Sequence, residues 1–273
     1  MAIITLARQV AALGDEVAEI LASKLNYQFI SRKEILDRLL ELGFNKNKID
    51  KYDERKPGFF ASFSKERDAY FNLSQFAMLE AATKGNVIII GRGAFAIFKN
   101  TPNLVSCRLV ADYDTRITRL QKEKNLTEKQ AIQLIQESDA NRNGFHKDFY
   151  NVDVDDSTNF HMVLNTAKID LDHCAQIISD FTNKTITEQN EKEGKIYLDK
   201  LLAIQNVINK LIFEYKTKID FIHADIEDDS VVLYGVSDSP LIVEQAIQIM
   251  KENIPNSNIV SRVSIIHNFK SYQ

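Results

Sequence analysis

The feature of this sequence that most constrains its fold is an alternation of short apolar runs and amphipathic helical stretches over the first two-thirds of the chain. Strands are expected at 2–6, 28–30, 87–90, 106–111 and 162–164. The run 87–90 is apolar at every position, which is typical of a strand buried on both faces of a parallel sheet. Residues 1–181 are therefore predicted to form an α/β domain in which helices cover both faces of the sheet.

The carboxyl ends of the predicted strands indicate where a site should lie, because ligands of parallel sheets bind at that edge. Four segments follow predicted strands and meet there: 7–15, 31–34, 91–94 and 111–116. Ser31 and Glu34 also have the spacing of a helix capping box, which predicts that a helix begins directly after the second strand.

The length of 273 residues exceeds that of a typical single domain, so two domains are expected. Residues 182–195 are polar and contain almost no apolar side chain, which indicates a linker or a frayed helix start. Residues 196–273 show the patterns of helix, strand, strand, helix and strand, with the last strand ending at His267. This αββαβ order predicts a small second domain.

Composition argues against several classes of function. The formal net charge is −4, so the chain lacks the basic surface expected for nucleic-acid binding. No apolar run approaches the length of a transmembrane helix, and a cytoplasmic location is expected. Cys107, Cys174 and the five histidines show no metal-ligand spacing, so no metal site is predicted.

The turn after the first strand has the position of a phosphate-binding loop but few of its residues. Such loops bind phosphate through backbone N–H groups that glycines orient, together with a lysine and a serine or threonine. Here the turn contains Ala11, Ala12, Leu13, Gly14, Asp15 and Glu16. Two interpretations are open: the backbone binds phosphate, or the two acidic residues favour the positive end of the helix dipole and the turn binds nothing.

Arginines follow two other predicted strands. Arg92 lies between two glycines after the most apolar strand, where its guanidinium could fork onto a phosphate or a base edge. Arg116 and Arg142 lie on helical patterns after the fourth strand, and residues 144–150 could close over a ligand. For each arginine, a solvated surface position is the alternative.

Several short motifs together resemble the cytidylate-kinase-like family of bacterial P-loop proteins, over about residues 3–181. The motifs are ITLARQ at 4–9, FISRKE at 29–34, IGRGA at 90–94, RITR at 116–119, Asp139 with Arg142, STNF at 157–160 and VLNT at 163–166. The order and spacing of the motifs carry the resemblance, rather than any one of them.

The resemblance implies a five-stranded parallel sheet of the nucleoside-monophosphate-kinase type. It implies ATP with Mg²⁺ as donor and CMP or a related nucleoside monophosphate as acceptor. Arg8 and the turn at 11–16 would then hold the ATP phosphates. Arg32 and Arg92 would hold the acceptor. Arg116 and Arg142 would neutralise the transferring phosphoryl group, because phosphoryl transfer depends mainly on positioning and positive charge.

The turn departs from the family pattern at the positions that should bind phosphate. Family members carry a Gly-Ser-Gly-Gly-Arg-like run where this chain has Ala11, Ala12, Leu13, Gly14 and Asp15. Alanine and leucine adopt positive φ angles only at a cost, and an aspartate repels phosphate. These departures leave the fold prediction unchanged but argue against kinase activity.

Residues 196–273 resemble a BON domain, a small αββαβ module that binds proteins, small ligands or membrane surfaces. The resemblance rests on the segment SVVLYGVSDSP at 230–240, followed by Val243, Ala246 and a strand at 259–265. It implies a binding role rather than a catalytic one. The alternative is that Tyr234 and the alternating valines and leucines only form core and strand faces.

Three functions remain open from the sequence. An active kinase predicts ATP binding and magnesium-dependent transfer. A catalytically degenerate kinase-like protein, acting through its C-terminal domain, predicts no turnover. A nucleotide sensor would bind a monophosphate through Arg32 and Arg92 without transferring anything. The arginines favour the first function, whereas the turn at 11–15 favours the other two.

Overall fold

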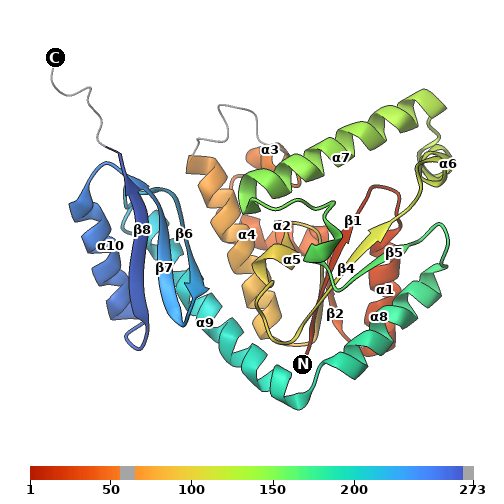
Figure 1. The fold of residues 1–273 in the computed structure, drawn as a ribbon. Coiled ribbons are helices and arrows are strands. Elements are labelled where there is room, and N and C mark those ends of the chain that lie inside the picture. Colours follow the sequence, from red (N-terminus) through yellow and green to blue (C-terminus); the bar gives the residue numbers. More distant parts are fainter. Residues whose placement is uncertain (56–64, 267–273) are drawn as a thin grey trace.

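The computed structural model describes residues 1–55 and 65–266, whose arrangement is shown in Figure 1. Its first part is a five-stranded parallel sheet with the strand order β2-β3-β1-β4-β5. The strands are β1 (Ile3–Arg8), β2 (Gln28–Ile30), β3 (Val87–Ile90), β4 (Leu104–Val110) and β5 (Met162–Asn165). Each lies where a strand was expected, so the predicted parallel α/β sheet is confirmed.

Helices cover both faces of this sheet. Each face of the sheet has its own hydrophobic core. Along β3, Val87 and Ile89 belong to one core, and Ile88 and Ile90 belong to the other. The helices are α1 (Gly14–Leu25), α2 (Arg32–Glu41), α3 (Ile49–Tyr52), α4 (Lys65–Thr83), α5 (Ala94–Ile97), α6 (Tyr113–Lys124), α7 (Glu128–Tyr150) and α8 (Leu171–Thr185), with 3-10 turns at Lys46–Lys48 and Ser157–Asn159. Helices α1 and α8 pack on one face, and α2 and α4 on the other.

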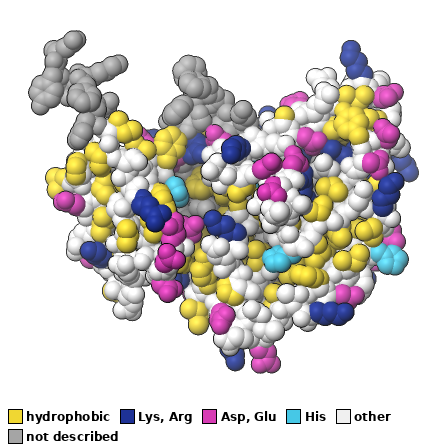
Figure 2. Space-filling model, in the orientation of Figure 1, with side chains coloured by type: hydrophobic (Ala, Val, Ile, Leu, Met, Phe, Trp, Pro, Cys, Tyr) yellow, Lys and Arg dark blue, Asp and Glu magenta, His cyan; other side chains and the backbone are white. Residues whose placement is uncertain are grey.

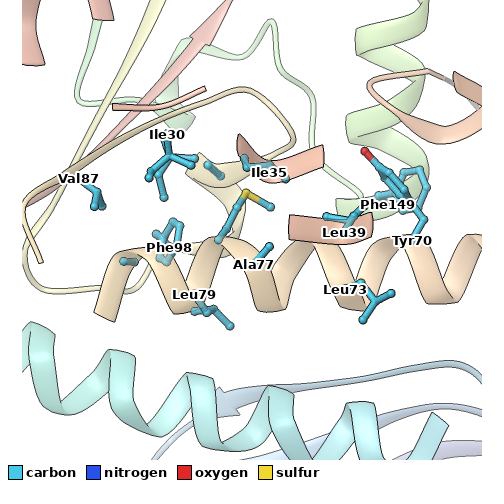
Figure 3. Packing of buried hydrophobic residues seen from close by; sticks show 14 of the residues in the cluster. Ile30, Ile35, Leu39, Tyr70, Leu73, Ala77, Leu79, Val87, Phe98 and Phe149 are labelled. Carbon is cyan, nitrogen blue, oxygen red and sulfur yellow. The ribbon is translucent and has the colours of Figure 1, made fainter. Parts of the chain in front are cut away.

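Helix α4 lies at the centre of the core on its face of the sheet. Figure 3 shows Tyr70 and Ala77 of α4 with Ile35 and Leu39 of α2 and Val87 of β3. None of these five side chains is more than 5 % exposed. Burial of apolar surface at about 25 cal/mol per Å² fixes α2 and α4 against the sheet, and so fixes the loops at its carboxyl edge.

The second part consists of α9 (Glu188–Phe213), β6 (Asp220–Glu227), β7 (Ser230–Ser237), α10 (Pro240–Asn253) and β8 (Asn258–Ile265). This is the expected αββαβ order, although the expected strand end at His267 lies outside the described residues. Strand β7 pairs antiparallel with β6 and parallel with β8. The likeness to a BON domain stays a prediction.

In neither part do the described residues contain a helix with the length and apolar character needed to cross a membrane.

One helix, α9, joins the two parts and belongs to both cores. Leu198 packs in the core around α4, whereas Leu211 packs in the core of the three-stranded sheet. The segment 182–195, interpreted from the sequence as a linker or frayed helix start, forms the end of α8 and the first turns of α9. The expected domain boundary at residue 196 therefore falls inside one helix.

Polar contacts also join the two parts. The Phe221 N–H donates to Asp68 Oδ2 at 3.0 Å, and Gln205 Nε2 donates to Asn72 Oδ1 at 3.0 Å. Figure 2 shows acidic and basic side chains gathered along this junction. A cavity of about 490 Å³ lies there, between α4, the end of α7 and strand β6.

Candidate functional site

The loop between β1 and α1 has a left-handed backbone at two positions without glycine. Ala11 has a φ of 58° and Leu13 a φ of 56°. Each such residue costs roughly 1–2 kcal/mol relative to right-handed backbone. Backbone strain of this kind persists where the surrounding structure imposes it, and it is frequent at ligand sites. The loop therefore has the conformation that glycines would favour, although it lacks them.

Two arginines of α6 hold the carbonyl groups of this loop. Arg116 Nε donates to Val10 O at 2.9 Å, and Arg119 Nη1 donates to Ala11 O at 2.9 Å. The Arg116 side chain is 3 % exposed, and its Nη2 also binds Asp139 Oδ1 at 2.7 Å. Arg116, assigned by resemblance to the transferring phosphoryl group, thus has the contacts of a residue that positions the loop.

The glycine that the loop does contain, Gly14, is required by packing. A β-carbon at this position would lie 2.8 Å from Arg8 Cγ, which is too close for two carbon atoms. Asp15 and Glu16 follow it in the first turn of α1, and both are exposed. Their carboxylates lie at the positive end of α1, where a phosphate group would otherwise be favoured.

Glycine at the two left-handed positions is expected to stabilise the protein. Ala11→Gly and Leu13→Gly should each raise the free energy of unfolding by about 1 kcal/mol, because the strain is relieved. Ala12→Gly is the matched control, since Ala12 is buried and its φ is not positive. It should lower the free energy of unfolding by about 0.5–1 kcal/mol. Urea unfolding measures all three, and destabilisation by the first two would contradict the strained loop.

Glu54 lies at the centre of the charges at the carboxyl edge. Its Oε1 lies 2.5 Å from Arg8 Nη1 and accepts a hydrogen bond from the Arg92 N–H at 3.1 Å. Its Oε2 lies 3.6 Å from Arg142 Nε. Burial raises the pKa of Glu54, but the positive charges of Arg8, Arg142 and Arg92 outweigh burial and hold that pKa well below its usual range. Glu54 is therefore ionised at neutral pH.

The neighbouring Asp53 joins the two arginines that the resemblance assigns to the acceptor. Asp53 Oδ1 accepts from Arg92 Nη2 at 2.6 Å, and Oδ2 accepts from Arg32 Nε at 2.6 Å. The Arg32 side chain is 55 % exposed, whereas that of Arg92 is fully buried. Arg92 Nε and Nη1 have no hydrogen-bond partner among the described residues. Arg92 therefore faces Asp53 inside the protein instead of forking onto open space.

The turn that carries Arg92 is held by the end of α7. Gly91, Arg92 and Gly93 have φ angles of 76°, 52° and 73°. Tyr150 Oη donates to Arg92 O at 2.8 Å, and a β-carbon on Gly93 would lie 2.1 Å from the Tyr150 ring. The second glycine thus allows α7 to approach the turn, so α7 and the carboxyl end of β3 are fixed together.

A cavity of about 240 Å³ lies beside this turn, at the carboxyl ends of β1 and β4. Its charged lining residues are Arg8, Arg108, Arg142, Glu54, Asp139 and Asp155. Helix α7, which supplies part of the lining, extends across this end of the sheet in Figure 1. Two arginines predicted from the sequence, Arg8 and Arg142, therefore meet in one cavity, whereas Arg32, Arg92 and Arg116 are not among its lining residues.

Arg108 is a site residue that the sequence reasoning missed. Its guanidinium donates to Val154 O and to Asp155 Oδ1, and the residue is 7 % exposed. The available signal was a single arginine inside the apolar strand Leu104–Val110. A buried charge is costly unless it is paired, so its position in a strand indicates a specific role. Asp53 and Glu54 were also missed, because they lie in a polar stretch without periodicity.

Burial lowers the pKa of two groups of α7 at this cavity. It lowers the pKa of Arg142, opposed by the negative charge of Glu54. It also lowers the pKa of His146, whose Nδ1 lies 2.7 Å from Arg142 O. His146 Nε2 has no hydrogen-bond partner in the described part of the chain. His146 is therefore neutral at neutral pH. The cationic groups of the cavity are its three arginines, and three carboxylates in the lining balance them.

The residues of the site do not fit a protein-held Mg²⁺ ion. Across residues 1–55 and 65–266, no three Asp, Glu, His or Cys side chains are grouped so that they could bind a metal ion. The carboxylates at the cavity, Glu54, Asp139 and Asp155, are each bound by an arginine. Mg²⁺ that arrives with ATP would have to be held by the nucleotide phosphates and water.

The parallel sheet, the left-handed loop after β1 and the arginine-lined carboxyl edge define a kinase-like protein of the P-loop type. Residues 3–168 match the cytidylate kinase-like family, and the chain belongs to that family. The family resemblance inferred from the motifs is thereby confirmed, as is a nucleoside-monophosphate-kinase-like character. The match does not extend to the C-terminal sheet.

One protein of known sequence and one solved structure are similar to this chain. A cytidylate kinase from Methanocaldococcus jannaschii is 28 % identical over 167 residues, which cover 60 % of this chain and 87 % of the relative. A crystal structure of an uncharacterized protein from Eubacterium ventriosum aligns with a TM-score of 0.55 and 20 % identity. That alignment covers 67 % of this chain and 98 % of the other, and it supports the fold alone.

Proposed function

We propose that this protein binds CMP or a closely related nucleoside monophosphate and transfers to it a phosphoryl group from ATP. The observation that carries the proposal is the convergence of Arg8, Arg108 and Arg142 on one small cavity at the carboxyl edge of the sheet. Guanidinium groups match the geometry of phosphate oxygens, and phosphoryl transfer requires mainly positioning and positive charge. Membership of the cytidylate kinase-like family supports the same reaction.

The arginines of the cavity have different proposed roles. Arg8 lies at the start of the loop and would face the ATP phosphates. Arg142, on α7, would neutralise the transferring phosphoryl group. Arg108 would hold the acceptor phosphate from the end of β4. Glu54 fixes Arg8 at 2.5 Å and lies 3.6 Å from Arg142, so it would orient both groups before the nucleotides bind.

The other predicted arginines would act from outside the cavity. Arg32 is exposed enough to contact the acceptor nucleoside directly. Arg92 would act through Asp53, which binds both Arg92 and Arg32. Arg116 would keep the loop in its left-handed conformation through Val10 O. None of these three roles requires the side chain to touch the transferring group.

ATP binding by the loop would rest on its backbone. The left-handed residues Ala11 and Leu13 give the turn a shape in which successive N–H groups can face a phosphate. No lysine follows, and Asp15 and Glu16 reduce the attraction of the helix terminus for an anion. The affinity for ATP is therefore expected to be lower than the affinity for the monophosphate.

A nucleotide sensor is the second candidate, and Asp15 at the terminus of α1 is the observation that favours it. A sensor would bind the monophosphate in the arginine cavity and would transfer nothing. Isothermal titration calorimetry with CMP, dCMP and ATP–Mg²⁺, each added alone, separates the candidates. Heat from CMP and from ATP supports the kinase. Binding heat from CMP alone supports the sensor. No binding heat from any of the three nucleotides contradicts both candidates.

The C-terminal part is proposed as a binding module. None of its described residues, up to 266, lines the arginine cavity, which argues against a direct role in transfer. The resemblance to a BON domain suggests a protein, a small ligand or a membrane surface as its partner. A cytoplasmic location and the absence of a nucleic-acid partner stay predictions.

A further inference from the structure

Strand β8 forms a free edge of the small sheet. The strand order is β6-β7-β8, so within the described residues β8 pairs only with β7 (Figure 1). It is eight residues long, and Arg262 is its one charged residue. Proteins usually shorten, twist or charge such an edge, because a long unpaired strand accepts another strand. Edge β8 is therefore a surface suited to main-chain pairing.

The register of β8 with β7 shows which backbone groups are free. The Ile266 N–H donates to Ser237 O, so the even-numbered residues of β8 direct their N–H and C=O groups to β7. Ile259, Ser261 and Val263 then direct theirs away from β7. The Val263 N–H agrees with this orientation, since it donates to Ser261 Oγ of its own strand at 3.2 Å.

We infer that β8 pairs antiparallel with β8 of a second copy of this chain, about a two-fold axis at Ser261. Ser261 would then face Ser261 of the second copy, and Ile259 would face Val263. In all three residues the N–H and C=O groups point away from β7, so each facing pair would be a hydrogen-bonded pair. The Val263 N–H would exchange Ser261 Oγ of its own strand for an acceptor of the second copy. The two small sheets would become one six-stranded sheet, in which β8 of each copy is an inner strand.

Arg262 and Val260 favour this register. Arg262 Nη1 binds Glu227 Oε2 at 2.7 Å and Tyr234 Oη at 2.9 Å, so its guanidinium lies on the side of β6 and β7. An axis moved by one residue, to Arg262, would place the two Arg262 residues opposite each other and leave Val260 facing Ser264, without an apolar contact. With the axis at Ser261, Arg262 instead faces Val260 of the second copy. Val260 is 39 % exposed in the single chain, so an apolar side chain also becomes covered.

Helix α10 offers a second self-complementary surface beside the same edge. Asn253 Oδ1 accepts from Lys210 of α9 at 2.9 Å, so that flank of α10 faces α9. At 3.6 residues per turn, Glu244, Ile247 and Lys251 lie on the opposite flank, beyond β8. A two-fold axis would bring Glu244 of one copy to Lys251 of the other, with the two Ile247 side chains between these ion pairs.

Ser261 of β8 and Ile247 of α10 lie at similar positions along the direction of the strand. From Asn258 to Ser261 the strand advances about 10 Å, which equals about seven helical residues. If the end of α10 is level with the start of β8, counting back seven residues from Asn253 reaches Ala246, the neighbour of Ile247. One axis can therefore pass near both Ser261 and Ile247, as a two-fold dimer requires.

Analytical ultracentrifugation of the full chain tests the dimer. The wild type should sediment with twice its 31.2 kDa mass. Ser261→Pro should weaken the dimer by at least about tenfold, because proline removes a donor that faces the second copy while leaving the bonds to β7. A wild type that stays monomeric overturns the proposal. So does a Ser261→Pro variant that folds and dimerises as the wild type does.

A charge exchange tests the α10 contact separately. Lys251→Glu places two acidic side chains together and should weaken the dimer by about tenfold. The double variant Glu244→Lys/Lys251→Glu reverses both charges and should restore wild-type association. Failure of the double variant to recover, with its helix content unchanged, would overturn the assigned contact.

A disulfide tests the register. In the proposed pair the Cα atoms of the two residues 261 lie about 5.5 Å apart, within the disulfide range. Ser261→Cys should therefore form a covalent dimer on mild oxidation. Ile265→Cys is the matched control, since its two copies would lie about 27 Å apart. The native cysteines are buried. Equal cross-linking of both variants, or none by Ser261→Cys, would overturn the register.

Discussion

Glu54→Ala is expected to lower the free energy of unfolding by about 3–5 kcal/mol, because it leaves buried positive charge without a partner. The Arg8 and Arg142 side chains are 9 % and 18 % exposed, and Arg92 is fully buried. The Arg92 N–H would also lose the carboxylate oxygen that accepts its hydrogen bond. Urea unfolding followed by circular dichroism measures the change.

Two controls show whether the effect comes from the buried charge. Glu54→Gln keeps an oxygen for the Arg92 N–H but removes the charge, so its effect should be smaller than that of alanine. Glu80→Ala removes a carboxylate that binds Arg38 at 2.7 Å on the partly exposed surface. That loss should be at most about 1 kcal/mol. If Glu54→Ala and Glu80→Ala lower the free energy of unfolding equally, Glu54 does not stabilise the fold by pairing buried arginines.

The same carboxylate makes stability depend on pH with a defined sign. The pKa of Glu54 in the folded protein lies well below its ordinary value. The stabilisation is therefore fully present above the unfolded pKa of about 4.3, and it is lost as the pH falls through the folded value. The difference in stability between wild type and Glu54→Ala should shrink below about pH 4. A difference that grows in acid would contradict the assignment.

Arg142→Ala is expected to lower the rate of phosphoryl transfer by about 10³-fold. Arg142 lines the cavity, and Ser138 Oγ accepts a hydrogen bond from its Nη1 at 2.5 Å. If its charge acts mainly on the transferring group, kcat should fall far more than KM for CMP rises. Steady-state kinetics of CDP formation, with both substrates varied, measures the two constants.

Lys129→Ala is the matched control for this variant. Lys129 is an exposed cation on the same helix α7, outside the cavity lining. Its removal changes the charge of α7 equally and should leave both constants within about twofold, as expected for a surface charge. If Arg142→Ala keeps the wild-type kcat, whether or not its KM rises, Arg142 does not stabilise the transition state and its proposed role is contradicted.

The parallel sheet could be predicted because its strands are apolar on both faces. The segment 87–90 shows this most clearly, and it forms β3 with all four residues buried. The segment 182–195 was harder, because the first turns of α9 are largely exposed and hence polar. A capping box of Thr187 and Asn190 begins α9, and the spacing of these two residues was the one local indication of a helix start.

The sequence could predict a site residue only where its type alone, an arginine, indicated that it could bind phosphate. Arg8 could be chosen as a cation at the end of the first strand, and Arg142 as a cation on a helical pattern whose role the family resemblance implies. Asp53 and Glu54 could not, since their partners Arg92 and Arg8 are 39 and 46 residues away in sequence. Burial of Arg92 follows from that long-range contact.

The loop conformation was beyond sequence reasoning for the same reason. Alanine and leucine have no preference for positive φ, yet Ala11 and Leu13 both adopt it. The arginines that bind the loop carbonyls lie on α6, more than 100 residues later. A local pattern cannot report a conformation that distant side chains impose.

Chromatographic detection of CDP from the full-length wild type incubated with ATP, Mg²⁺ and CMP tests the proposed reaction. The proposal predicts that CDP and ADP form in equal amounts, that omission of CMP abolishes both, and that Arg142→Ala slows both together. A wild type that binds CMP in calorimetry but forms no CDP would contradict the kinase and leave the sensor. Steady ADP release without CDP would identify an ATP hydrolase and contradict transfer to the nucleotide.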